Sequence, residues 1–436
     1  MRLFLERVVT FSLLFLAMGA FSNLFWGSDL REGSVLVAPS HLGLSVLEVF
    51  IYLGCGAFAL LYYKSTLVSL AVAWPFLLVN AFAFASTLWS VDIGTTLRRG
   101  GVFLGTTVFG IYLGGRYSVG EFQKILLQSF LIMLAASFML LPVLPGAVLD
   151  QYHTGAFRGL TDHKNIFGEY MAILLILGMT YNFPPRWRVA RFAVIALAIC
   201  MELWAHSGTS LLAMVAAVLI IPFLFLLRLE KRQAVSLTLI GSGILGYLFV
   251  AIGRESDAIL NLMGKDRTLT GRSQVWTLVW QAILRRPWLG YGFDSFWQGL
   301  KGESYRVISQ VGWPVAHSHN GYLEALLGFG AIGCSLIAIA VLRAGALTLS
   351  YVRQERSVVG LWPLAFLAFY LAHATGEAGF ITRDGFSYLL LVTLSTSLAL
   401  RSRQKKAEDE SRSEYSYARK DEVQILVPVL RLENAE

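Results

Sequence analysis

The chain has 436 residues, of which 56% are hydrophobic and only 15% are charged. Because about a quarter of an ordinary soluble chain is charged, this composition excludes a typical soluble protein and favours an integral membrane protein. The net charge of +8 does not indicate nucleic-acid binding, since the Lys and Arg residues lie between apolar runs, where they set membrane orientation. The three cysteines lie far apart inside apolar runs, which is not the spacing of a metal site or a disulfide framework.

Long apolar runs follow one another along the chain, and a membrane crossing needs about 20 such residues. The runs are continuous rather than alternating, so they predict helices and not the strands of a barrel. We therefore expect an all-α polytopic membrane protein with about twelve transmembrane helices. The expected spans are residues 8–26, 43–63, 66–88, 100–115, 124–145, 165–183, 191–206, 210–227, 235–252, 321–342, 358–375 and 385–400.

The distribution of positive charge predicts the orientation of these spans. When the N-terminus is placed in the cytoplasm, most Lys and Arg residues of the short loops fall on the cytoplasmic side, as membrane proteins prefer. Residues 1–400 then form one transmembrane domain with both termini in the cytoplasm. The tail, 401–436, is dense in mixed charge and is expected to be disordered. One long polar loop, about 253–320, falls outside and is expected to carry function.

The middle of the outer loop, 271–286, has the apolar spacing of an amphipathic helix. Several tryptophans accompany it, namely Trp276, Trp280, Trp288 and Trp297. Indole side chains favour the boundary between lipid and water, so we expect this element to lie at the outer membrane surface.

Basic residues on the outer side oppose the orientation signal, so another role should favour them. They include Arg98, Arg99, Arg158, Lys164 and Arg272, and the histidines also fall on the outer side or near outer helix ends. A cationic, histidine-bearing cavity that opens outward suits an anionic substrate. The alternative is that these residues are ordinary interfacial charges whose side chains reach the headgroups.

The first candidate segment is R-G-L-T-D-H-K-N, residues 158–165, just before an expected span. Asp162 is expected to cap that helix, which would put His163 and Lys164 in its first turn beside Asn165. The N–H groups and positive dipole end of a helix start favour phosphate, so Arg158, His163 and Lys164 would complete a diphosphate site. The alternative is a capped helix start with interfacial charges.

The other candidate segments lie in and after the outer loop. Arg272 opens the expected amphipathic helix, and its planar, permanently charged guanidinium matches phosphate oxygens. H-S-H-N-G-Y-L-E, residues 317–324, leads into a later span. His319 is a candidate general base because its pKa lies near physiological pH. Asn320 and Glu324 are four residues apart on one helical face, so Glu324 is expected to help organise the site. His317 and His319 have no zinc-site spacing on a helix.

The sequence lacks the motifs of several other enzyme classes. It has no phosphate-binding loop of ATP hydrolysis, no serine nucleophile elbow and no H-E-x-x-H zinc motif. The glycines Gly328, Gly330 and Gly333 lie inside an expected span, where small residues indicate close helix packing.

With these segments in hand, the chain resembles the O-antigen ligase and exopolysaccharide-polymerase superfamily of bacterial membrane glycosyltransferases, in particular its ExoQ branch. The motifs are W-S-V-D-x-x-x-T-L-R-R at 89–99, H-K-N-x-x-G at 163–168, G-R-x-x-x-W at 271–276, P-W-L-G-Y-G at 287–292 and H-N-x-x-L-E at 319–324. The resemblance covers about residues 85–340. Each motif is short, and it is their order and shared outer location that make the set specific.

The resemblance implies a substrate and roles for named residues. The donor would be an oligosaccharide on undecaprenyl diphosphate at the outer face of the bacterial inner membrane. Arg272 would bind the diphosphate and His319 would activate the acceptor hydroxyl, with Arg158, His163 and Lys164 completing the anion site. The chain has no D-x-D motif on the outer side, so we expect a metal-independent, inverting enzyme without a cofactor. Membrane lipids, a flippase and a chain-length co-polymerase are the expected partners, and nucleic acid is not.

Three rival functions stay open at this point. An O-antigen ligase, which joins glycan to the lipid A core, shares donor and motifs with a polymerase. A flippase or other transporter of lipid-linked glycans is the rival from another class, although it would favour ionisable groups near the bilayer midplane. A non-catalytic assembly partner is the third.

Overall fold

A computed structural model describes residues 2–19, 53–54, 56–57, 60–150, 155–226, 271–313, 315–383 and 385–432. Within these ranges the chain is helical, apart from one isolated bridge between Leu149 and Phe157. The α-helices are α1 (Arg2–Ala17), α4 (Tyr63–Val72), α5 (Trp74–Ala85), α6 (Ile93–Arg116), α7 (Val119–Leu140), α8 (Pro145–Val148), α9 (Lys164–Thr180), α10 (Arg188–Ala205), α11 (Gly208–Leu226), α14 (Arg272–Arg285), α15 (Gly302–Val311), α16 (Gly321–Gln354), α17 (Trp362–His373) and α18 (Phe386–Leu432). The 3-10 turns are η1 (Ser86–Leu88), η2 (Pro185–Trp187) and η3 (Val358–Leu361).

The all-α prediction is confirmed for the described residues, whereas the number of twelve spans is not. Two of these helices, α7 and α16, are both long and apolar enough to cross a bilayer, and α4 with α5 makes a third if this pair, bent by 79°, is one span. The segments Gly208–Ile221 of α11 and Val358–His373 (η3 with α17) are apolar but shorter. The expected span 235–252 and most of the span 43–63 lie outside the described residues.

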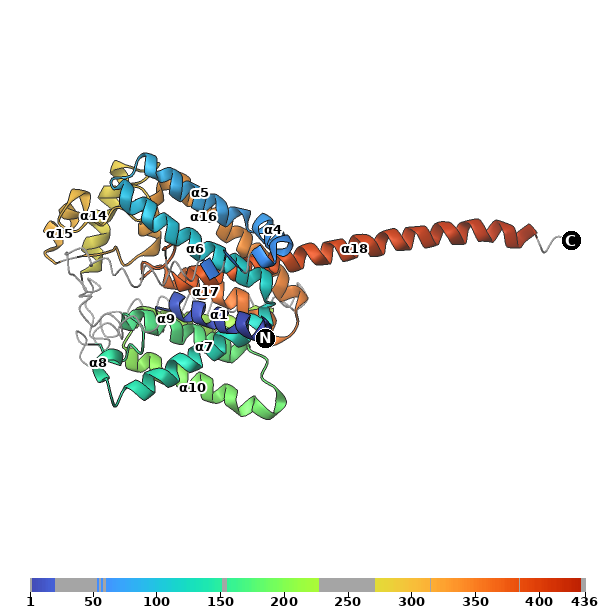
Figure 1. Cartoon of the computed structure of the whole chain (residues 1–436), viewed down its shortest axis with the longest axis horizontal. Coiled ribbons are helices and arrows are strands. Elements are labelled where there is room, and N and C mark those ends of the chain that lie inside the picture. The colour runs from blue at the N-terminus through green and yellow to red at the C-terminus, as the bar shows by residue number, and fades with distance from the viewer. Residues whose placement is uncertain are drawn as a thin grey trace.

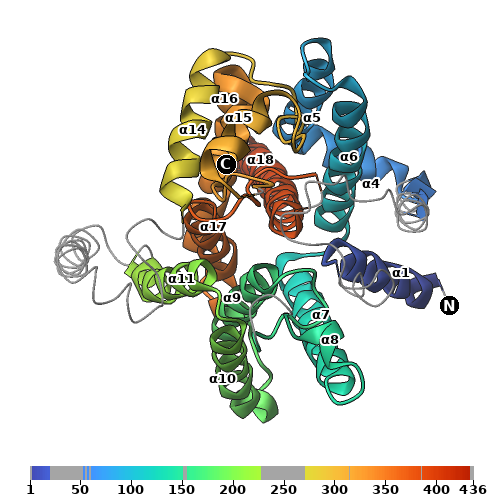
Figure 2. The ribbon, with the colours of Figure 1, turned by 90° about the vertical axis from the view of Figure 1, so that its left-hand side faces the viewer.

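The core of the bundle lies around α9, which α7, α10, α11 and α17 surround (Figure 2). Residues from Met171 to Leu177 are all buried, with at most 1% of each exposed. A helix that is apolar on every face belongs in such an interior position. The helices α6 and α18 pack closely at Gly114, where an added Cβ would lie 2.4 Å from the carbonyl oxygen of Thr393. Small residues allow this backbone approach.

At the break between α4 and α5, an arginine from another helix donates to a backbone carbonyl oxygen. Arg343 of α16 donates from Nη1 to the carbonyl oxygen of Val72, the last residue of α4, at 2.6 Å. In lipid an unpaired backbone carbonyl costs several kcal/mol, so a bend inside a membrane domain needs such a partner.

The helix α16 is interrupted at Gly330, whose φ of 60° and ψ of −171° are not helical. The segment that follows α14 enters this break. The carbonyls of Pro287 and Trp288 accept from the amides of Ala331 and Ile332 at 2.8 and 3.1 Å, and the amide of Tyr291 donates to Leu327 O at 2.8 Å. The P-W-L-G-Y-G run therefore completes the hydrogen bonding of a broken helix.

The outer loop contains the expected amphipathic helix. α14 buries Val275, Val279, Ala282 and Ile283 against Tyr291 and the apolar face of α15, and these residues form a second core cluster. This cluster lies at the end of the bundle opposite the projecting part of α18 (Figure 1). The first part of the loop, 253–270, lies outside the described residues.

The tail differs from the prediction of disorder, because α18 continues through it to Leu432 and projects from the bundle (Figure 1). The correction has a physical reason. Mixed charges at helical spacing support a helix, and Lys406 pairs with Glu410 one turn later at 3.7 Å. Arg401 also pairs with Glu355 at 3.2 Å, which ties the start of the tail to the end of α16.

Candidate functional site

Four helices begin close together at the end of the bundle opposite the projecting part of α18, the end predicted to be the outer one (Figure 1). His163 is the N-cap of α9, Thr209 lies in the first turn of α11, Arg272 is the first residue of α14 and Asn320 is the N-cap of α16. Hydrogen bonds join three of these starts to the segment 374–385 that follows α17. Because each helix start carries a partial positive charge, their convergence favours an anion.

A carboxylate, Glu377, occupies the centre of these helix starts. Its Oε1 accepts from Asn165 Nδ2 at 2.9 Å and lies 3.4 Å from Arg272 Nη2, and its Oε2 lies 4.0 Å from His319 Nδ1. The side chain is 12% exposed. Burial raises the pKa of Glu377, and the nearby Arg272 opposes that rise. The structure thus brings together Arg272, His319 and Asn165, three residues predicted from separate segments.

The motif-based reasoning missed Glu377. It lies in a short segment, T-G-E-A-G, between two apolar runs, and beyond the region that the family motifs cover. The signal that could have found it is an acidic residue between small ones at an outer helix end, because a carboxylate beside lipid needs cationic partners.

Arg272 is fixed on several sides. Its Nη1 donates to the carbonyl oxygen of Gly376 and lies 3.4 Å from Thr209 Oγ1. Trp276 lies one turn further along α14, and its indole Nε1 donates to the carbonyl oxygen of Ser318 at 2.9 Å. The spacing in G-R-x-x-x-W therefore lets one helix hold both the arginine and the loop that carries His319.

His319 adopts a left-handed backbone conformation, with a φ of 52°. Its ring lies 4.1 Å from that of His317, and its amide donates to His317 Nδ1 at 3.3 Å. Burial lowers the pKa of His319 well below its usual range, and the neighbouring His317, Arg272 and His163 lower it further. The imidazole is therefore neutral and has a lone pair with which to accept a proton.

Three predicted substrate-binding residues near His319 are occupied by the protein itself. The side chain of Asn320 caps α16 by accepting from the amides of Tyr322 and Leu323 at 3.0 and 3.1 Å. Glu324 accepts from the amide of Ser318, and His317 accepts from the amide of His319. These contacts shape the 317–320 loop.

The segment 158–165 is arranged differently from the prediction. His163, and not Asp162, is the N-cap of α9, and its Nδ1 accepts from the amide of Asn165 at 3.1 Å. The imidazole Nδ1 lies close enough to the backbone to accept from an amide of the first turn, as an Asp carboxylate oxygen would. Lys164 Nζ donates to the carbonyl oxygen of His206 at 3.1 Å. Arg158 is 6% exposed and donates to the carbonyl oxygens of Gly146 and Asp162, so it braces its own loop.

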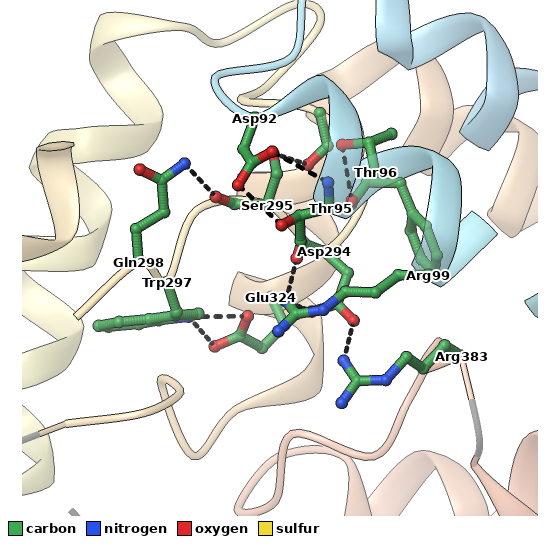
Figure 3. Close-up of polar contacts among 12 residues, drawn as sticks. Asp92, Thr95, Thr96, Arg99, Asp294, Ser295, Trp297, Gln298, Glu324 and Arg383 are labelled. Carbon is green, nitrogen blue, oxygen red and sulfur yellow. Dashed lines mark hydrogen bonds and ion pairs between the residues drawn. The ribbon is translucent and has the colours of Figure 1, made fainter. Parts of the chain in front are cut away.

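One arginine of α6, Arg99, belongs to a second cluster around Asp294 (Figure 3). Arg99 Nη1 lies 3.2 Å from Asp294 Oδ1, and Arg383 donates to Asp294 Oδ2. Arg98 is exposed on the same helix. The structure therefore places Arg99 in a polar network beside the Glu377 cluster rather than in it.

Comparisons with known proteins agree with the motifs. The family model described as O-antigen ligase matches residues 192–338, less than half of the chain, and this range holds both Arg272 and His319. The chain is also 24% identical over 282 residues to the exopolysaccharide production protein ExoQ of Rhizobium meliloti (strain 1021). That match covers 60% of this chain and 62% of ExoQ, so it spans less than two thirds of the relative's length. Both matches confirm the resemblance to the O-antigen ligase and ExoQ-like superfamily.

Proposed function

We propose that this relative of the O-antigen ligases is a glycosyltransferase of the bacterial inner membrane. It polymerises oligosaccharide repeat units carried on undecaprenyl diphosphate, at the periplasmic face. The donor arrives already activated on its lipid, because nucleotide sugars are not available outside the membrane. His319 acts as the general base and Arg272 holds the diphosphate leaving group.

The observation that carries this proposal is the meeting of Arg272 and His319 around Glu377, where four helices begin. The sequence predicts both residues for these roles, and they lie within one polar cluster. A guanidinium has five N–H donors, so Arg272 can hold Glu377 and a phosphate oxygen at the same time. The positive helix ends add to the attraction for an anion.

The proposed reaction is a single displacement. His319 takes the proton of the acceptor hydroxyl while the hydroxyl oxygen bonds to the anomeric carbon of the donor. The bond from that carbon to the diphosphate oxygen breaks, the lipid diphosphate leaves with the electron pair, and the configuration inverts. Arg272, with Asn165, His163 and Lys164 at the neighbouring helix start, stabilises the charge that grows on the leaving group. In this proposal the cationic side chains do this work without a metal.

The lowered pKa of His319 keeps the imidazole neutral before the reaction but also makes it a weak base, so the proposed role requires this pKa to rise when the donor binds. Besides burial, three neighbouring side chains lower this pKa through their positive charge, namely His317, Arg272 and His163. A bound diphosphate would neutralise them, which would make the imidazole a stronger base when the donor is present.

Transfer of glycan to the lipid A core is the second candidate, because the matching family model is described as O-antigen ligase. Polymerase and ligase reactions use the same chemistry and differ in the acceptor. We favour the polymerase because the curated relative is a protein of exopolysaccharide production. The product distinguishes the two candidates: long free polysaccharide from a polymerase, or glycan bound to lipid A core from a ligase.

The test is complementation of a strain that lacks this gene with His319→Ala and Arg272→Ala variants. Arg306→Ala is the matched control, since Arg306 lies in the same outer loop but its side chain is 63% exposed. Loss of a base or of a leaving-group cation should lower transfer by about a hundredfold or more, while the control stays normal. Membrane levels of each variant are measured by immunoblot.

The products then decide between the candidates. Accumulation of single lipid-linked repeat units in both variants supports the polymerase, and lipid A core without glycan supports the ligase. Normal polymer in the His319→Ala strain would make His319 structural and would reopen the transporter and assembly-partner functions.

A further inference from the structure

The loop that carries His319 is bent in a way that needs support. His319 has a φ of 52°, a backbone conformation that residues other than glycine rarely adopt. Its neighbour Asn320 is already committed to capping α16. Backbone strain of this kind persists only where surrounding contacts hold the residue in place.

Ser318 supplies that support, because every polar atom of this residue is bonded. Its amide donates to Glu324 Oε1, its carbonyl accepts from Trp276 Nε1 at 2.9 Å, and its hydroxyl donates to the carbonyl oxygen of Asn320 at 2.9 Å. Ser318 is fully buried, so water does not compete for these bonds. Ser318, the residue before His319, is thus held by Trp276 of α14 and by Glu324 of α16.

Glu324 links this loop to the segment that follows α14. Its two carboxyl oxygens accept from the indole Nε1 of Trp297 at 3.0 and 3.1 Å (Figure 3). Its Oε1 also accepts from the amide of Ser318. Glu324 lies in the first turn of α16, and its carboxyl oxygens accept hydrogen bonds from donors of the protein itself. A group used in this way supports a loop and does not bind substrate.

The segment with Trp297 is itself anchored to the bundle three residues earlier. Asp294 pairs with Arg99 of α6 and with Arg383, just before α18 (Figure 3). Asp294 also has a left-handed φ, of 50°. The contacts therefore run from α6 and from the segment before α18, through Asp294 and Trp297, to Glu324.

We propose that Glu324 is a positioning residue that holds His319 in its left-handed turn, with Trp297 and the Asp294 ion pairs as its support. The inference rests on the proposed function, since it assigns the base its geometry. Glu324 acts on the rate of proton transfer through the loop and leaves the Arg272 cluster, which binds the donor, unchanged.

The test is the kinetics of Glu324→Gln in lipid nanodiscs, with lipid-linked repeat units purified from cells that lack the gene. Glutamine keeps the size of the side chain but replaces one acceptor oxygen with an N–H₂ donor, which would face the Ser318 amide or the Trp297 indole. We expect kcat to fall by about tenfold or more, with KM for the donor within about twofold of the wild type. A general loss of folding would lower the active fraction, which a titration of active protein and the melting temperature would reveal.

Two further variants make the test sharp. Glu303→Gln is the same chemical change in the same outer loop, where Glu303 pairs with Arg285 at 2.8 Å, and it should leave kcat unchanged. Trp297→Phe removes only the indole donor to Glu324, and it should lower kcat by a smaller factor, about threefold. This variant also serves as the test if Glu324→Gln does not fold.

The outcomes separate this inference from the proposed function. A Glu324→Gln enzyme with the kcat of the Glu303→Gln control, or with a raised KM and normal kcat, would overturn the positioning role while the function stands. Absence of transfer by the wild type itself would overturn the proposed function and, with it, this role.

Discussion

At the scale of single residues, burial controls which side chains at the outer end can exchange a proton. Glu377 and His319 are each 12% exposed and lie 4.0 Å apart, and burial is the largest cause of both pKa shifts. Burial raises the pKa of the acid and lowers that of the base, so both shifts favour the neutral forms. A neutral imidazole beside a charged guanidinium is the combination that proton removal next to a phosphate requires.

The lowered pKa of His319 leads to a prediction about pH. A general base works when it is unprotonated, so activity falls as pH drops through its pKa. Because this pKa lies below the ordinary value of about 6.5, kcat/KM should change by less than about twofold from pH 8 to pH 6. The measurement is the initial rate of transfer with limiting donor at a series of pH values.

A variant at the neighbouring histidine provides the control for the pH prediction. His317→Asn keeps an acceptor for the amide of His319 but removes an ionisable ring that lowers its pKa. The acid limb should therefore move upward by a small amount, since burial, the larger cause, is unchanged. Half-loss of wild-type activity near pH 6.5 would contradict the neutral-base assignment.

At the scale of elements, the break in α16 explains how the segment that follows α14 is held against the bundle. The backbone of Pro287 and Trp288 takes the place of the missing helical turn, so the loop after α14 is bonded to a membrane helix. Only glycine fits at the point of contact: an added Cβ at Gly330 would lie 2.4 Å from the carbonyl carbon of Trp288. The φ and ψ of Gly330 are also those of a region that other residues avoid.

Gly330→Ala should therefore destabilise the protein by about 2 kcal/mol or more, through both strain and collision. The melting temperature of the purified protein in nanodiscs measures this effect. Gly345→Ala lies on the same helix, where the nearest atom to an added Cβ is 3.8 Å away, and it should cost nothing or stabilise slightly. Equal melting temperatures for the two variants would show that the backbone of Trp288 and Leu289 moves away from the added methyl group at little cost in stability.

At the scale of the whole molecule, the predicted site and the projecting part of α18 lie at opposite ends of the bundle (Figure 1). Opposite ends of a membrane bundle face opposite compartments, and the charge distribution of the sequence predicts that the tail is cytoplasmic. The proposed chemistry requires this polarity, because the lipid-linked donor is used outside.

Single cysteines test the orientation. With Cys55, Cys200 and Cys334 replaced by alanine, Ser309→Cys on α15 should react with a membrane-impermeant maleimide on intact spheroplasts. Ser411→Cys on α18 should react only after permeabilisation; both positions are exposed in the structure. The reverse pattern would overturn the predicted topology and, with it, a periplasmic site.

Hydrophobic runs and charge bias by themselves predicted the helical class, the helix α14 and most of the helix positions, because these depend on local residue order. The motifs also predicted Arg272, His319 and Asn165 as site residues, and each of them lies at or next to a helix start. Composition alone did not predict the extension of α18 through the charged tail. Opposite charges at helical spacing can support a helix even where apolar residues are few.

The tertiary structure alone decided which polar residues meet. Glu377 lies in a segment without a motif, and the packing of α17 beside α11, whose Thr209 lies 3.4 Å from Arg272, brings it to Arg272. The same packing assigned Asn320 and Glu324 to the loop and Arg99 to Asp294, because a buried polar group must be bonded to whatever neighbour the fold supplies. Local sequence determines what a helix start can bind, and long-range packing determines what it does bind.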